Sequence, residues 1–226
     1  MMGKQLQNLT FEQWLAYVFD HPVEENRNAW YWDMDADKWH EIPADVIRFL
    51  TRAFENAAEV FQPYSDAQLN QGLWFIASNA CSNHMFALID KSVPWSARQR
   101  CISSIHQLYE QCFAKRCTPH LSHLDEPGAS LLNLVCYMWW DIVPLMGHPE
   151  DSTGAEFDRS ILHVMESTLE LDSIACQESA LHRLGHWQPQ YPEHVGEIIN
   201  KFSMTHPNLR KELETYMMNA FTGHVL

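Results

Sequence analysis

Helical patterns with clear start and stop signals run along almost the whole chain, and they constrain its fold more than any other feature. Thr10 and Gln13 have the spacing of a capping box at the start of an amphipathic segment, and Pro22 marks the end of that segment. Pro43 and Pro94 each stand at the start of another long segment with apolar residues at helical spacing. Only 8 glycines occur in 226 residues, which argues against a loop-rich β fold. These patterns predict an all-α protein.

The last third of the chain has the most regular rhythm. Its predicted helices have similar lengths and lie near residues 155–170, 173–186, 192–204 and 208–221. Two helical hairpins in series are typical of repeat proteins. Residues 118–128 form the clearest connector, and the second loop, at 147–154, is short for a domain linker. We therefore predict a single domain over residues 1–226, irregular over 1–117 and more repeat-like over 129–226.

Residues 30–42 interrupt the helical pattern. Two short aromatic runs, Trp30–Trp32 and the one at Trp39, flank a centre that is rich in aspartate. Alternation of this kind, bounded by turn-forming residues, is typical of paired strands. The sequence therefore predicts a small β-hairpin near residues 30–42.

The aspartates of this segment have the spacing that opens a calcium-binding loop. The EF-hand pattern then requires glycine and glutamate at positions that Lys38 and Ala44 occupy here. A solvated turn between aromatic strands is the better interpretation.

One helix resembles a known repeat family. Residues 172–186 begin with aspartate, continue with a small-apolar pattern and end on Ala180-Leu181-x-x-Leu184-Gly185, as the second helix of a HEAT repeat does. Cys176-Gln177 departs from the Val-Arg that the family often has there. The match lies within the predicted helix pair at 155–187. The resemblance implies a right-handed α–α superhelix, a HEAT-like stack of antiparallel helix pairs that holds a partner in its concave face.

The chain is strongly acidic, with 15 Lys and Arg against 29 Asp and Glu and a formal net charge of -14. Proteins that bind nucleic acid neutralise phosphates with a basic face, so this balance argues against nucleic acid as a partner. It also argues against docking on an anionic membrane. It is compatible with plain solubility or with a protein partner that is basic.

The first residues contain no apolar core of a signal peptide, and no apolar run is long enough to span a membrane. The 6 cysteines include no Cys-x-x-Cys pair. We therefore expect reduced cysteines that serve as small core residues, and a cytoplasmic protein.

Histidines suggest a metal site. Glu178, His182 and His186 share one helix face because they are spaced by four residues. His120 and His123 lie in the 118–128 connector and could complete a set of ligands for zinc or iron. The alternative is that these are ordinary face and loop residues, in which case no cofactor is expected.

Aromatic clusters are the remaining feature. They are either core residues or anchors for a partner, since Trp dominates binding hot spots. Asp141 would then hold a basic group of the partner beside them. The residues concerned are Trp30, Trp32, Trp39, Trp139 and Trp140.

No phosphate-binding loop, hydrolase elbow or dinucleotide fingerprint occurs, so no catalytic residue is assigned. The leading hypothesis is a non-enzymatic, protein-binding helical scaffold, or an acidic inhibitor such as an immunity protein. One alternative is a metal-dependent enzyme with a His/Glu site. Another is a small-molecule binder with an aromatic pocket between helices.

Overall fold

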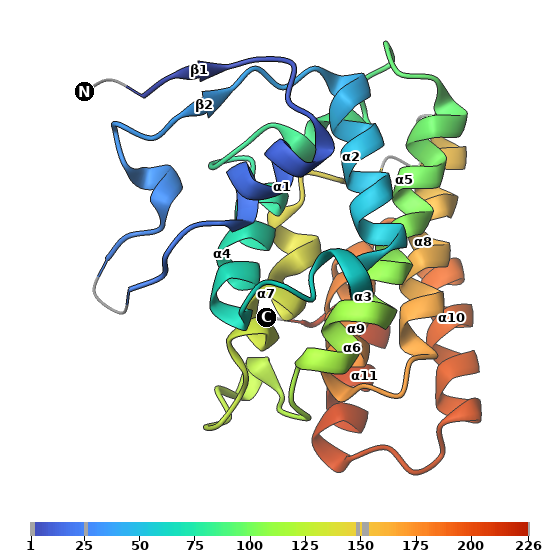
Figure 1. Ribbon diagram of the computed structural model, residues 1–226. Helices are drawn as coiled ribbons and strands as arrows, with labels where there is room; N and C mark the ends of the chain where they lie inside the picture. The colour runs from blue at the N-terminus through green and yellow to red at the C-terminus, as the bar shows by residue number, and fades with distance from the viewer. Residues whose placement is uncertain (1–2, 25–26, 148–149, 151–153, 226) are drawn as a thin grey trace.

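The computed structural model describes residues 3–24, 27–147, 150 and 154–225. Helices make up most of it, which confirms the prediction of an all-α fold (Figure 1). The longer helices form two rows, and consecutive members of each row pack against one another. The first row consists of α1 (Phe11–Phe19), α4 (Asp66–Ala77), α7 (Leu131–Ile142), α9 (Ile174–Trp187) and α11 (Lys211–Thr222).

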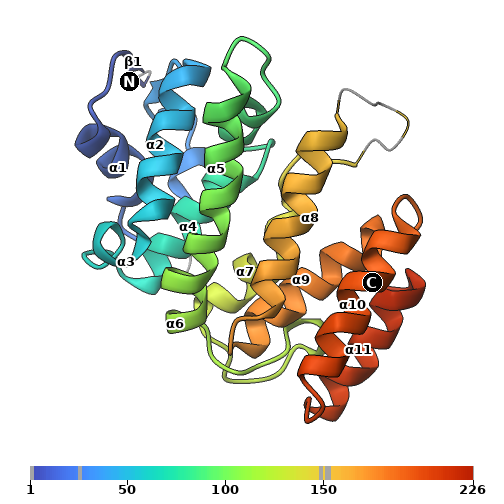
Figure 2. The ribbon, with the colours of Figure 1, turned by 90° about the vertical axis from the view of Figure 1, so that its right-hand side faces the viewer.

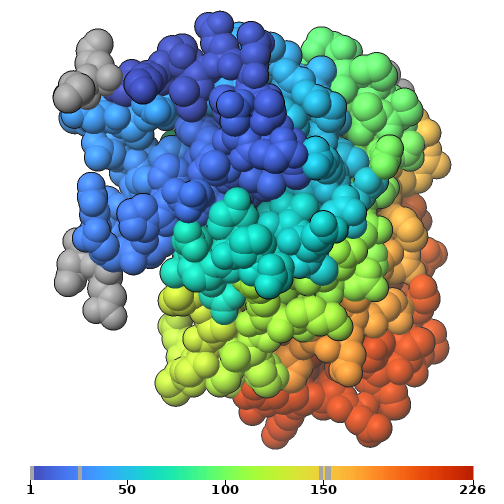
Figure 3. All heavy atoms as spheres, in the orientation of Figure 1, coloured from blue at the N-terminus to red at the C-terminus, as the bar shows by residue number. Residues whose placement is uncertain are grey.

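The second row faces the viewer in Figure 2, where its members succeed each other from left to right in chain order. It consists of α2 (Pro43–Glu55), α5 (Trp95–Leu108), α8 (Ala155–Leu169) and α10 (Pro192–Thr205). In the space-filling view, the N-terminal part of the chain covers the upper region of one face and the C-terminal helices lie at its lower right (Figure 3). The relation to HEAT repeats and the hand of a superhelix stay predictions.

Short elements connect the rows. The helices are α3 (Ala57–Val60) and α6 (Ala114–Arg116), with a π-helical turn at Tyr109–Phe113 before α6. Single 3-10 turns occupy Trp30–Trp32, His84–Leu88 and Ser122–Leu124.

The N-termini of several helices are capped by residues next to them in the sequence. The Thr10 hydroxyl accepts the backbone N–H of Gln13, whose side chain accepts the N–H of Thr10, so the capping box before α1 is confirmed. Ser65 and Gln68 make the same reciprocal pair before α4. Pro43 is the first residue of α2, where its missing N–H costs nothing.

The predicted hairpin at 30–42 is wrong. Trp30–Trp32 form a 3-10 turn, and the strand β2 (Lys38–Trp39) pairs in parallel with β1 (Gln5–Leu6). Trp30 and Tyr31 both pack against Phe75 of α4, with ring centroids 4.7 and 5.4 Å away. An extended strand would point these neighbouring side chains to opposite faces, so packing against α4 favours the turn.

The core includes the centre of the first row. Trp139 and Trp140 are adjacent on α7 and both are buried, because α7 packs between α4 and α9. Trp39 is also buried. The cysteines are free, and Cys101, Cys112, Cys136 and Cys176 are core residues as predicted. Within the described residues, no helix is both long and apolar enough to cross a membrane.

The helix α9 is the most enclosed element, because α7, α8, α10 and α11 all pack against it. Every side chain from Ala175 to Leu184 is buried, and half of these residues are polar or charged. Buried polar groups are costly unless they find partners. The partners of the α9 side chains define the candidate site.

Candidate functional site

A carboxylate and two imidazoles converge where α7 passes α9. The Asp141 Oδ2 atom lies 2.6 Å from His182 Nε2 and 3.7 Å from His186 Nε2. The two histidine rings are perpendicular, with centroids 4.7 Å apart. One ligand atom from each of the three residues lies within 4.8 Å of the others. In the described part of the chain, this is the one group of three or more such residues close enough to share a metal ion.

The exposure of the three residues is graded. His182 is buried, with a side chain only 2% exposed, whereas the Asp141 and His186 side chains are 22% and 41% exposed. One side of the group is therefore fixed in the core and the His186 side opens to solvent. A ligand could enter from that side without disturbing the core.

Two tyrosine hydroxyls hold the other nitrogen of His182. The Nδ1 atom lies 2.5 Å from the Tyr216 hydroxyl and 3.1 Å from the Tyr137 hydroxyl. The two hydroxyls are 3.1 Å apart and come from α11 and α7. Burial raises the pKa of Tyr216 and of Tyr137, so both hydroxyls keep their protons at neutral pH. Contacts on both nitrogens fix the plane of the imidazole.

The charge on Asp141 is stabilised by its neighbours. Burial alone would raise its pKa, but the pKa is lowered overall, and the hydrogen bond and charge interaction with His182 are the main causes of the lowering. His186 and Arg183 lower it further. The Asp141 Oδ1 atom is buried without a hydrogen-bond partner among the described residues, and the Arg183 guanidinium is 3.8 Å from it. This carboxylate therefore still has an oxygen that could accept a bond.

Burial lowers the pKa of both basic neighbours. The Arg183 side chain is 5% exposed and donates a hydrogen bond to the carbonyl of Leu145. For His186, burial is also the largest cause, and the attraction of Asp141 opposes it. A neutral imidazole is the form that ligates metals.

Glu178, which the sequence groups with His182 and His186, lies outside this group. Its carboxylate accepts the backbone N–H groups of Ser122 and His123, each at 2.9 Å, and contacts His123 Nδ1 at 2.6 Å. The amides of the 3-10 turn at Ser122–Leu124 therefore engage Glu178. His120 bonds the Thr118 hydroxyl at 2.8 Å and also lies outside the group.

The structure therefore places four of the five predicted metal residues in two sets, and His120 belongs to neither. His182 and His186 meet Asp141, whereas His123 pairs with Glu178. The two sets touch through Tyr216, because the His123 ring stacks on it with centroids 4.1 Å apart. Tyr137 was not predicted, although it precedes Asp141 by four residues on α7 and so shares its helix face.

The aromatic residues predicted as partner anchors lie in two different environments, the core and a pocket. Trp39, Trp139 and Trp140 are buried and offer no surface to a partner. Trp30 and Trp32 instead line a pocket near the N-terminus. Asp141 faces histidines rather than an exposed aromatic patch.

No protein-family model, curated protein or solved structure matches this chain.

Proposed function

We propose that this protein binds a divalent transition-metal ion through Asp141, His182 and His186, and that the metal has open positions for water or a substrate. The observation that supports this most directly is the convergence of three ligand atoms within 4.8 Å of one another. Two imidazoles and one carboxylate suit zinc or ferrous iron. Three protein ligands are typical of catalytic metal sites, whereas structural zinc sites are usually closed by four.

The contacts around His182 support the same proposal. A histidine that ligates metal usually donates its other ring N–H to an oxygen, which fixes the ring and raises its basicity. Here the Nε2 atom faces Asp141, and the hydroxyls of Tyr137 and Tyr216 stand at the Nδ1 atom. A metal at Nε2 would place the ring proton on Nδ1, where a tyrosine oxygen accepts it.

The change in geometry that binding requires between Asp141 and His182 is small. Zinc bonds of 2.0–2.2 Å at tetrahedral angles place ligand atoms about 3.3 Å apart. The distance from Asp141 Oδ2 to His182 Nε2 is 2.6 Å, so the carboxylate would move outward by less than about 1 Å. The Asp141 side chain is 22% exposed, and a small rotation about its side-chain bonds would supply this shift.

The chemistry implied is that of a metal-dependent enzyme. Zinc lowers the pKa of a bound water to about 7, which supplies a hydroxide nucleophile at neutral pH. The half-exposed side of the group, at His186, is where that water and a substrate would enter.

Calorimetric titration of the metal-free protein with zinc chloride tests the proposal. We expect one equivalent of zinc to bind with a micromolar or lower Kd. Asp141→Asn and His186→Gln should each raise the Kd by at least about tenfold, which corresponds to roughly 1.4 kcal/mol. The His186 side chain is 41% exposed, so its replacement should not unfold the protein.

His163→Gln is the matched control, because its side chain is 75% exposed on α8. We expect it to bind zinc like the unmodified protein. The proposal fails if the metal-free protein takes up no zinc, or if His163→Gln weakens binding as much as His186→Gln does.

A further inference from the structure

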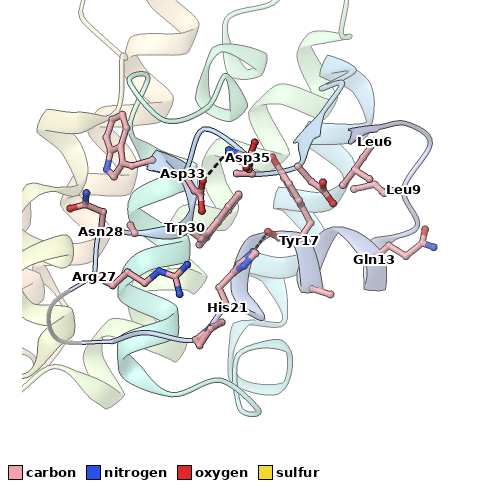
Figure 4. Close-up of a pocket in the computed structure, with 16 residues that line it drawn as sticks. Leu6, Leu9, Gln13, Tyr17, His21, Arg27, Asn28, Trp30, Asp33 and Asp35 are labelled. Carbon is pink, nitrogen blue, oxygen red and sulfur yellow. Dashed lines mark hydrogen bonds between the residues drawn. The ribbon is translucent and has the colours of Figure 1, made fainter. Parts of the chain in front are cut away.

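A pocket of about 940 Å³ lies between α1 and the segment that leads from it to β2. Trp30 stands at its centre, with Tyr17 on one side and Asp33 and Asp35 above it (Figure 4). Arg27 lies on the opposite side from Tyr17 (Figure 4). The residues that line it belong to other elements than the Asp141 group, so this inference is independent of the proposed metal site.

The aromatic wall of the pocket is rigid. Trp30 stacks on His21 with centroids 4.1 Å apart and planes inclined by 14°. Tyr17 meets Trp30 edge-on at 5.2 Å, and Phe75 of the core supports it at 4.7 Å. The His21 ring is fixed by a hydrogen bond of 2.7 Å from its Nε2 atom to the carbonyl of Tyr17. A preformed aromatic surface of this kind favours binding, because little side-chain entropy is lost.

The charges that line the pocket favour a positively charged ligand. Its lining includes three carboxylates, Asp33, Asp35 and Asp37, and one guanidinium, Arg27. Arg27 is already close to a carboxylate of its own, at 3.6 Å from Glu24.

Hydrogen bonds hold the carboxylates of Asp33 and Asp37 in place. Asp33 accepts the N–H of Asp35 at 2.9 Å, and Asp37 accepts the N–H of Lys4 at 2.7 Å. The Asp141 group is the one metal-type group in the described ranges, and it includes none of these aspartates. A cationic organic ligand therefore fits this lining better than a metal ion does.

We propose that this pocket binds a lysine- or arginine-bearing segment of a partner protein. Because His21 and Phe75 already contact Trp30, a basic side chain would place its cation against the exposed Trp32 ring and bond the aspartates. The pocket lies at the upper end of the range of small-molecule sites, which suits a peptide segment. Trp32 is 55% exposed beside it and Met34 is 95% exposed, and such side chains are typical anchors for a protein partner.

Fluorescence anisotropy with two labelled peptides tests this inference. In one peptide glycine alternates with lysine and arginine, and in the other it alternates with glutamate. Both are titrated with the full chain in the presence of EDTA, so a failure of the metal proposal cannot affect the result. We expect the basic peptide alone to bind.

Variants then locate the site. The triple variant Asp33→Asn, Asp35→Asn, Asp37→Asn should weaken binding at least about tenfold. Trp32→Ala should weaken it about fivefold at constant charge. The matched controls remove three exposed carboxylates or one exposed apolar side chain far along the chain. The control for the triple aspartate variant is the triple variant Glu193→Gln, Glu197→Gln, Glu214→Gln. The control for Trp32→Ala is Met204→Ala.

Three results would overturn the proposal. The first is an equal loss of affinity in the triple glutamate control, which would show diffuse attraction by the acidic surface. The second is equal binding of the glutamate peptide. The third is full competition by tetramethylammonium at a concentration near the peptide's Kd, which would assign the pocket to a small organic cation.

Discussion

At the scale of single residues, His182 carries the most contacts that matter for the proposed metal site. Asp141 lies at its Nε2 atom, and the Tyr216 hydroxyl lies 2.5 Å from its Nδ1 atom. Metal at Nε2 requires a proton on Nδ1, and the Tyr216 oxygen is the nearest acceptor for it. Tyr216 is therefore a positioning residue, since it acts on the metal through the imidazole.

Tyr216→Phe tests this role. The ring would still stack on His123, but the nearer acceptor for the Nδ1 proton is lost and only the Tyr137 hydroxyl, at 3.1 Å, remains. We expect the Kd for zinc to rise by about tenfold, as for other outer partners of metal-binding histidines. Zinc calorimetry measures the effect, and Tyr64→Phe is the control, because Tyr64 packs on Phe19 far from the site along the chain. An unchanged Kd in Tyr216→Phe would show that the hydroxyl does not support the metal.

A second buried histidine makes stability depend on pH. His84 is fully buried, and its Nε2 atom accepts the indole N–H of Trp14 at 2.9 Å. Burial lowers the pKa of His84 to about 3. Unfolded histidine titrates near pH 6.5, so the unfolded chain binds a proton that the folded chain refuses. The free energy of unfolding therefore falls as the pH falls from about 6.5 toward 3.

Glu41 opposes this trend. Its carboxylate lies 3.5 Å from His84, and burial raises its pKa from 4.5 to about 7. The folded state holds the Glu41 proton more tightly than the unfolded state does. The stability that Glu41 contributes is therefore present below about pH 4.5 and is lost as the pH rises toward 7.

His84→Gln separates the two effects. The amide oxygen can still accept the Trp14 N–H, but position 84 no longer titrates. We expect the stability advantage of the unmodified protein over the variant to shrink as the pH falls from neutral to about 5. Urea unfolding at a series of pH values measures it, with His163→Gln as the exposed control. A constant difference across this range would contradict the account of His84.

At the scale of elements, two glycines show how closely the helices approach. A Cβ atom on Gly72 of α4 would lie 2.2 Å from the Phe19 ring at the end of α1. Phe19 is buried and cannot move away without disturbing the core. A Cβ atom on Gly196 of α10 would meet only the Phe221 ring, at an ordinary contact distance of 3.7 Å.

Opposite effects are expected when each glycine becomes alanine. Gly72→Ala should lower the free energy of unfolding by about 1–3 kcal/mol because it overpacks the α1–α4 contact. Gly196→Ala should raise it by up to about 1 kcal/mol, because alanine is the better helix former. Chemical denaturation of both variants measures the two changes. Stabilisation by Gly72→Ala would show that α1 is not packed as described.

The elements that the sequence predicts well are the ones fixed by short-range contacts. The capping boxes at Thr10 and Ser65 join residues three apart, so their signals are visible in a short window. The turn at Trp30–Trp32 depends on Phe75, which is distant in the chain. The turn therefore could not be predicted from the local sequence pattern of residues 30–42.

The same distinction applies to the candidate site. His182 and His186 were predicted together because one helix turn separates them. Asp141 reaches them through the packing of α7 on α9, which the sequence does not reveal. Glu178 accepts the Ser122 and His123 amides instead of joining the two histidines, and backbone donors leave no sequence signal.

At the scale of the whole molecule, the two rows of helices place the two proposed sites on different parts of the stack. The Asp141 group lies between α7 and α9, which are central in the first row. The aromatic pocket lies beside α1, the first helix of that row. The net charge of -14 favours cationic ligands at both sites. Enclosure of α9 by four helices keeps His182 in the core, while α9 exposes His186 near its end.

Anomalous diffraction from a zinc-soaked crystal, recorded at the zinc absorption edge, tests the central proposal most directly. We expect a peak about 2.0–2.2 Å from Asp141 Oδ2, His182 Nε2 and His186 Nε2, and none at this position after Asp141→Asn. A zinc-soaked crystal with peaks only at exposed histidines, such as His163, would contradict the proposed metal site.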